Sequence, residues 1–278
     1  MIKFATVVLS LATLFAGAAQ AGTTFSPYAA STEERVPLTL SAAAPAAPLA
    51  SGYVCAGNSV PAGTVITSID RSRCGTIATH YYQTAYSGIY ACSISPIPAG
   101  YAFDSISTGS QCNGLNLYHL VQPSDNTYVC SGSPVPSPFV VTAIDPNTSI
   151  CRGMSRYAVS RARSGIQVCN ISPIPSPYVV VAIGPTSVCS TGGKLYAIQP
   201  VASNITVCSI SPIPDGYVVD SAGPSGVCNT FNGYHLITPY AGVAVCPFSP
   251  VPTGWQISGG TPTNRCAGFS RANVLQPQ

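Results

Sequence analysis

Twelve cysteines at almost even intervals constrain this chain more than any other feature. Six of them open a recurring segment and follow one another at steps of 37 to 39 residues: Cys55, Cys92, Cys130, Cys169, Cys208 and Cys246. A second cysteine follows each of these after 19 to 21 residues: Cys74, Cys112, Cys151, Cys189, Cys228 and Cys266. A fixed period of this length is the signature of a repeat architecture. We therefore expect six tandem units, at about 51–87, 88–126, 127–164, 165–203, 204–242 and 243–278.

The pattern inside a unit predicts β-structure. Two prolines lie four and six residues after the first cysteine, as in Pro212 and Pro214, and favour an extended segment at a sheet edge. Gly216 then allows a turn, and a β-branched run such as 179–183 predicts a strand. No segment after residue 22 shows sustained helical periodicity. The expected fold is all-β, with about three short strands in each unit of about 38 residues.

The segments that join neighbouring units resemble hairpins. Residues 118–122 and 127–130 flank the polar turn 123–126, which predicts a hairpin across the unit boundary. Residues 196–198 and 205–208 repeat the pattern. The first and last strands would then lack hairpin partners. An alternative architecture is therefore a closed, six-bladed, propeller-like ring in which these two strands pair.

Disulfide bonds are the expected use of the twelve cysteines, because a unit this small cannot bury a sufficient core alone. Pairing within each unit would close loops of about 20 residues, each stabilising by roughly 3 kcal/mol. An offset scheme pairs each second cysteine with the next unit's first, and leaves Cys55 to join Cys266 in a ring. Pairing within units is favoured because it needs no closure. The chain has no C-x-x-C motif and its cysteine gaps do not suit zinc, so we expect no metal and no cofactor.

The start of the chain predicts export. Residues 1–21 have the features of a secretory signal peptide: Lys3, an apolar stretch and a small-x-small end at 19–21. Residues 22–50 form an Ala/Pro/Ser-rich linker or N-terminal arm, in which 36–40 could add as a strand to another subunit in self-assembly. No later apolar run reaches the ~20 residues of a transmembrane span. We expect a secreted protein, at the cell surface, in the extracellular space or in the periplasm.

Charge and motifs argue against nucleic-acid binding and against catalysis. Charged residues make up 7% of the chain, and its net charge of +3 falls to +2 when Lys3 is removed. His119 and His235 both lie seven residues after a second cysteine. The other units carry different residues at the corresponding position: Tyr81, Ala158, Asn273 and, eight residues after its cysteine, Ala197. Such exchange favours a strand surface over a catalytic site, and the chain has no G-x-S-x-G motif. We expect no enzyme activity and no catalytic residue.

Two series of aromatic residues recur with the unit. The first comprises Tyr101, Phe139, Tyr178, Tyr217 and Trp255, and the second comprises Tyr118, Tyr157, Tyr196 and Tyr234. Exposed rings would offer stacking platforms for sugars, whereas buried rings would form the small core of each unit. A core role is favoured for the first series, and both roles remain open for the second. The candidate ligand-stacking residues are Tyr118, Tyr157, Tyr196, Tyr234 and Trp255.

Repetition suits multivalent binding, because several weak sites on one chain bind tightly together. We therefore expect a non-enzymatic protein that binds cell-surface or matrix components, with glycans as possible ligands. One alternative is a structural subunit of an extracellular fibre or coat. Another is a secreted inhibitor or effector.

Overall fold

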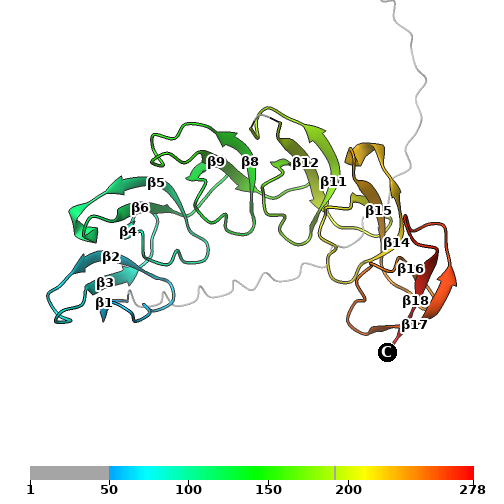
Figure 1. Cartoon of the computed structure of the whole chain (residues 1–278), viewed down its shortest axis with the longest axis horizontal. Helices are drawn as coiled ribbons and strands as arrows, with labels where there is room; N and C mark the ends of the chain where they lie inside the picture. Colours follow the sequence, from blue (N-terminus) through cyan, green and yellow to red (C-terminus); the bar gives the residue numbers. More distant parts are fainter. Residues whose placement is uncertain (1–49, 191) are drawn as a thin grey trace, which may run out of the picture. The chain divides into compact units, whose positions relative to one another are not determined.

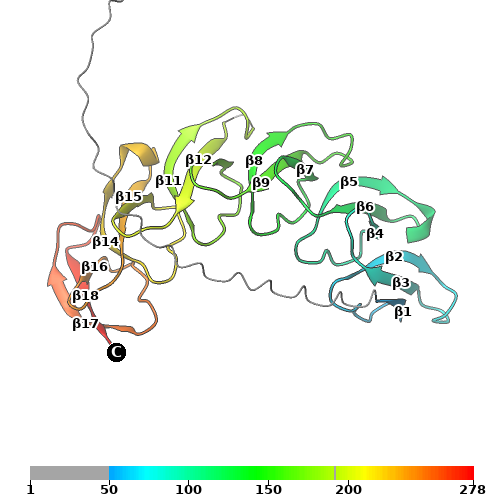
Figure 2. The same ribbon diagram turned by 180° about the vertical axis from the view of Figure 1, so that it is seen from behind.

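Each unit is a three-stranded antiparallel sheet, and the six sheets follow one another in chain order (Figure 1). Figure 2 shows the same succession of sheets from behind. The computed structural model describes residues 50–190 and 192–278. The predicted signal peptide (1–21) and the predicted arm up to residue 49 lie outside the described residues, as does the strand expected at 36–40.

The strands recur in three sets, named here by their order within a unit. The first strands, which end at or beside the first cysteine, are β1 (Ser51–Cys55), β4 (Tyr90–Cys92), β7 (Thr127–Cys130), β10 (Gln167–Cys169), β13 (Ile205–Cys208) and β16 (Ala244–Val245). The second strands are β2 (Thr64–Asp70), β5 (Ala102–Thr108), β8 (Phe139–Asp145), β11 (Tyr178–Pro185), β14 (Val218–Pro224) and β17 (Trp255–Pro262). The third strands are β3 (Thr79–Thr84), β6 (Asn116–Val121), β9 (Arg156–Arg161), β12 (Lys194–Pro200), β15 (Asn232–Ile237) and β18 (Arg271–Pro277). Short 3₁₀ turns, η1 (Ser110–Cys112) and η2 (Gly226–Cys228), precede two of the third strands.

The third strand lies in the middle of every sheet, which confirms the all-β repeat prediction but contradicts the predicted hairpins. In the second unit the order is β4-β6-β5, so β6 pairs with a strand on each side. No edge of β6 remains for β7, which pairs with β9 of its own unit. For the same reason β12 does not pair with β13. The hairpin prediction was wrong because both edges of each third strand are filled from within the unit.

The disulfides close within units, as favoured, and the offset scheme is wrong. The bonds are Cys55–Cys74, Cys92–Cys112, Cys130–Cys151, Cys169–Cys189, Cys208–Cys228 and Cys246–Cys266. Among the described strands, β1 pairs with β3 alone and β18 pairs with β16 and β17. The first and last strands therefore do not meet, and the propeller-like alternative is not formed.

The loop between the first and second strands contains the recurring prolines. The prolines lie in irregular chain before the second strand rather than in a sheet edge. The carbonyl of the second proline accepts the backbone N–H of the aromatic residue that follows, as in Pro214 and Tyr217 at 3.3 Å. Gly216 turns the chain between them with φ of +82°. The predicted glycine turn is confirmed there, since few L residues adopt that conformation.

Every second strand carries a β-bulge at the same point. One residue lacks a partner in the third strand: Thr67, Asp104, Thr142, Val181, Asp220 and Ser258. A bulge turns the neighbouring side chains and interrupts the regular pairing. In the first five units, the backbone N–H just before the bulge donates to a serine hydroxyl of the following unit.

These serines recur three residues after the first cysteine and join neighbouring units. The donor–acceptor pairs are Ile66–Ser95, Phe103–Ser133, Val141–Ser172, Val180–Ser211 and Val219–Ser249, at 2.8 to 2.9 Å. Each serine hydroxyl also donates to the carbonyl of the proline that follows it, as Ser211 does to Pro212. All five serines are buried. The position is thus a fixed connector that satisfies one buried backbone donor at each unit boundary.

The hydrophobic cores lie between units rather than inside them. The Cys130–Cys151 disulfide of the third unit packs with Phe103 and Leu120 of the second. Equivalent clusters surround the disulfides of the second, fourth, fifth and sixth units. Each of the first five sheets therefore buries one face against the next unit's disulfide, which is how stacked repeats build a core that a single repeat lacks.

The two end units show what changes where a unit has a neighbour on one side only. Asn58 stands at the connector-serine position of the first unit, which has no preceding repeat. In the last unit Ile257, equivalent to the buried Val219, is 51% exposed. Asn273, which pairs with Val245, takes the position that Tyr234 holds opposite Val207 in the fifth unit. Both residues lie on the sheet face that a following unit covers. The polar replacements at Asn58 and Asn273 are typical of capping repeats.

Replacing Ser211 by alanine should leave the buried N–H of Val180 without a partner. We expect Ser211→Ala to lower the free energy of unfolding by about 1–3 kcal/mol. The matched control is Ser209→Ala in the same loop, because within the described residues the Ser209 hydroxyl makes no hydrogen bond. Denaturant unfolding with intact disulfides measures both variants. Equal stability of the two would contradict the connector role.

Burial also predicts which disulfide is reduced first. The ten cysteines of units two to six are at most 2% exposed, whereas Cys55 and Cys74 are partly exposed because no unit precedes them. Under mild reduction of the folded protein we expect Cys55–Cys74 to open first. Alkylation followed by mass spectrometry reports the order. Simultaneous reduction of a second bond would show that the inter-unit cores do not shield the disulfides.

Candidate functional site

The first aromatic series lies in the inter-unit cores, as favoured. Phe139 is 6% exposed, and Tyr101, Tyr178, Tyr217 and Trp255 are half-buried against the clusters. The hydroxyl of Tyr101 donates to the carbonyl of Ala85 in the preceding unit at 3.0 Å. Tyr178 makes the equivalent bond to Ala162 at 2.9 Å. These rings therefore help to hold neighbouring units together.

The second aromatic series packs against the same clusters. Tyr118 stacks on Phe103 with ring centroids 4.2 Å apart, so one of its faces is covered. Tyr157, Tyr196 and Tyr234 are also half-buried against their clusters, and burial raises the pKa of Tyr196. The five predicted stacking residues, Trp255 included, thus each contact a core. The structure exposes a different set of aromatic rings.

An exposed row of tyrosines lies two residues before the first cysteines. Tyr53, Tyr90 and Tyr128 in units one to three are 47%, 47% and 44% exposed. The same position holds Gln167, Thr206 and Ala244 in units four to six, and we call these six residues the edge row. Because side chains alternate along a strand, each edge-row residue lies on the same sheet face as its cysteine. The row thus carries aromatic rings in its first half and non-aromatic side chains in its second.

Neighbouring side chains hold the first two rings in place. The guanidinium carbon of Arg73 lies 3.8 Å from the ring centroid of Tyr53, which also contacts Tyr81 at 5.1 Å between centroids. Tyr90 contacts the ring of His119 at 4.9 Å. A ring held in one orientation loses little conformational freedom when it binds a ligand.

The third ring is supported by an ion pair. The guanidinium carbon of Arg156 lies 4.8 Å from the ring centroid of Tyr128, and Arg156 forms a salt bridge with Asp145. The backbone N–H of Asn147 and the Arg156 guanidinium hold the pKa of Asp145 below its usual value. The arginine that supports Tyr128 is therefore anchored at neutral pH.

Two histidine–aspartate pairs lie next to the edge row. Nδ1 of His119 is 2.8 Å from Oδ1 of Asp104, and Nδ1 of His235 is 2.7 Å from Oδ1 of Asp220. An ionised carboxylate only accepts hydrogen bonds, so Nδ1 carries the proton in both pairs. Each aspartate is the bulge residue of its second strand. The bulge is what turns these carboxylates toward the third strand.

Sequence reasoning missed these pairs, although a signal was present. Both aspartates lie twelve residues after a first cysteine and fifteen before the histidine. In the sheets, each histidine lies opposite an edge-row residue: Tyr90 pairs with His119, and Thr206 with His235. In the last unit Val274 lies opposite the edge-row residue, Ala244. Counting along the sequence placed Asn273 there, but the loop between Cys266 and β18 is one residue longer than in the second and fifth units.

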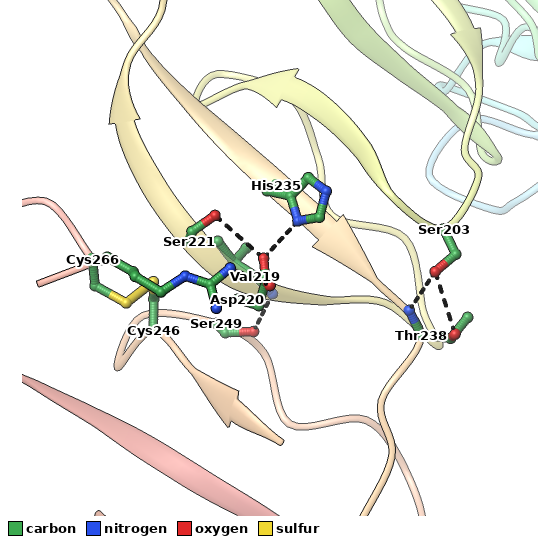
Figure 3. Close-up of polar contacts among 10 residues, drawn as sticks. Ser203, Val219, Asp220, Ser221, His235, Thr238, Cys246, Ser249 and Cys266 are labelled. Carbon is green, nitrogen blue, oxygen red and sulfur yellow. Dashed lines mark hydrogen bonds and ion pairs between the residues drawn. A yellow bond between two sulfur atoms is a disulfide. The ribbon is translucent and has the colours of Figure 1, made fainter. Parts of the chain in front are cut away.

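The fifth unit opens a hollow of about 330 Å³ beside His235. Figure 3 shows His235 and Ser221 around the Asp220 carboxylate, which is 12% exposed. Nη2 of Arg265, from the sixth unit, donates to Oδ2 of Asp220 at 2.9 Å. The equivalent hollow of the fourth unit, about 290 Å³, is lined by Ala197 instead of a histidine.

The hollow has polar groups ready for a ligand. With Nδ1 bonded to Asp220, Nε2 of His235 remains available, and in the described part of the chain no hydrogen bond engages it. No cluster of three or more histidine, cysteine, aspartate or glutamate side chains suits a metal among residues 50–190 and 192–278. The arrangement supports binding of a small ligand through hydrogen bonds.

Comparisons with known proteins assign no family. No family model, no curated protein and no solved structure matches this chain. In the part of the chain that the structure covers, no helix is long and apolar enough to cross a bilayer. The functional argument therefore rests on the edge row and on the hollow.

The tautomers of the histidines provide a direct check of the two pairs. We expect neutral His119 and His235 to carry their proton on Nδ1, because each aspartate accepts from that nitrogen. Nitrogen-15 chemical shifts of the imidazole rings distinguish the two tautomers. Asp220→Asn should change the pattern of His235 and leave that of His119 unchanged. A proton on Nε2 of His235 in the unaltered protein would contradict the geometry.

Proposed function

We propose that this is a secreted protein that binds glycans of a cell surface or matrix through its edge row. The observation that carries the proposal is the recurrence of one exposed tyrosine at the same position in three consecutive units. Each of these rings is held by a neighbouring side chain and leaves nearly half of its surface to solvent. The six disulfides support a protein that folds in an oxidising compartment.

Glycans fit the chemistry of the row better than charged polymers do. A tyrosine ring offers an apolar face and a polar hydroxyl, which suits the C–H face and the hydroxyl groups of a pyranose. A polymer of similar sugar residues can engage several equivalent rings at once. Weak individual contacts then combine into useful avidity. The low charge of the chain, +3 over 278 residues, provides no comparable attraction for a polyanion.

Replacing the three rings by residues that the row itself uses elsewhere should abolish this binding. The variant carries Tyr53→Gln, Tyr90→Thr and Tyr128→Gln, which copy Gln167 and Thr206 of the later units. We expect its affinity for a polymeric glycan to fall by about 100-fold or more, since avidity is lost together with each contact. Pull-down and titration against chitin, cellulose, mannan and peptidoglycan measure the effect.

The matched control replaces two tyrosines that are equally exposed but lie outside the row. Tyr86→Ser and Tyr240→Ser remove rings that are 54% and 62% exposed and that lie in segments between units. We expect this double variant to bind like the unaltered protein. The proposal fails if the unaltered protein binds none of the four polymers, or if both variants bind equally well.

A further inference from the structure

We propose that the hollow of the fifth unit is a pocket for a single neutral monosaccharide residue, held through a vicinal diol by His235 and Arg265. The inference rests on the proposed function only in its class of ligand. The hollow lies beside Thr206, in the half of the edge row that carries no ring. It is therefore a second kind of site, separate from the tyrosines of units one to three.

The second unit provides a comparison for this site within the same chain. The second and fifth units share the same histidine–aspartate pair, and the histidine side chain is similarly exposed in both, at 26% and 31%. The two pairs differ in the residues that lie beside the histidine. In the second unit Tyr90 lies against His119, and Leu117 occupies the neighbouring position of the third strand. In the fifth unit these positions hold Thr206 and Gly233. In the fifth unit a small side chain thus replaces the ring that contacts the histidine, and the hollow lies beside it.

Gly233 is required by space rather than by backbone conformation. Its φ lies outside the left-handed region that several other glycines of the chain adopt. A Cβ at this position would lie 2.9 Å from Cγ2 of Thr206 and 3.0 Å from Cβ of Ser225. Both residues line the hollow, so any larger residue at 233 would be forced into it or against its walls. Glycine leaves this part of the hollow open, although the hollow of the fourth unit forms with Leu195 at the equivalent position.

The polar groups in the hollow match a vicinal diol. In the neutral imidazole, Nε2 of His235 accepts a hydrogen bond because Nδ1 donates to Asp220. Arg265 is anchored on Asp220 through Nη2 and is otherwise exposed, so it retains N–H groups that can donate. One sugar hydroxyl can donate to Nε2 while the adjacent oxygen accepts from the guanidinium. Both side chains are fixed on one carboxylate, His235 through Nδ1 on Oδ1 and Arg265 through Nη2 on Oδ2, so the groups left for a ligand keep a constant arrangement.

Charge and size narrow the ligand further. Asp220 is neutralised by Arg265, so the site with a neutral histidine has no net charge and favours an uncharged sugar over a carboxylate. A volume of about 330 Å³ is at the lower end of the range of small-molecule pockets, roughly 300–1,000 Å³. It suits one pyranose ring. Ala222 and Pro224 provide an apolar wall for the C–H face of that ring.

Saturation-transfer NMR of the full chain with single methyl glycosides tests the proposal. The probes are the methyl glycosides of glucose, galactose, mannose and N-acetylglucosamine. We expect transfer to at least one of them, and a dissociation constant at least ten-fold weaker in His235→Ala and in Arg265→Val. Both changes copy residues found at these positions in sister units, Ala197 and Val227, so the fold should tolerate them.

His119→Ala, made in the triple tyrosine variant so that its contact with Tyr90 plays no part, is the matched control. It removes the equivalent pair of the second unit and should leave the transfer unchanged. The triple tyrosine variant should also retain it, which separates this site from the edge-row tyrosines. The proposal is overturned if no glycoside receives saturation, or if His235→Ala and Arg265→Val bind as well as the unaltered protein. Polymer binding that depends on the tyrosines would then still support the proposed function.

Discussion

The disulfide of each unit after the first is buried by the unit before it, and the rest of the structure depends on this arrangement. A three-stranded sheet of about 38 residues has too little apolar surface for a core of its own. The disulfide ties the first strand to the loop before the third, and together they form a compact apolar surface that covers the preceding sheet. The connector serine adds one directional hydrogen bond at each boundary. Hydrophobic burial thus supplies the free energy of stacking, and the serine sets its register.

The bulge beside this connector links folding to function. The serine accepts the N–H just before the bulge, so each boundary contact is made where the second strand departs from regular pairing. The extra residue is then free to vary. Thr142 bonds back to the sheet through its hydroxyl, whereas Asp104 and Asp220 reach a histidine in the third strand. The bulge thus recurs with the packing of the units, and the side chain of its extra residue gives individual units different polar groups.

The candidate sites were only partly predictable because exposure depends on neighbouring units. The periodic tyrosines attract attention in the sequence, yet Tyr118 and Tyr234 face the next repeat and pack against its disulfide. Tyr53, Tyr90 and Tyr128 show an equally regular spacing. Their exposure follows from lying on an edge strand beyond the reach of the adjacent unit. The pairing of His235 with Asp220 required knowledge of the bulge, since regular register would not bring a residue at that position toward the histidine.

The sequence by itself determined the number of units and their β-structure, and it favoured the pairing of cysteines within them, because period, proline placement and loop length are local properties of the chain. It did not determine strand order. A third strand between the first two satisfies both of its edges inside the unit, and that choice removes both the hairpins and the ring that local turn signals suggest. Only the tertiary structure decided which face of each sheet is covered. Burial of one face against the next disulfide leaves the edge row exposed, and the bulge brings Asp220 to His235 at the side of the hollow.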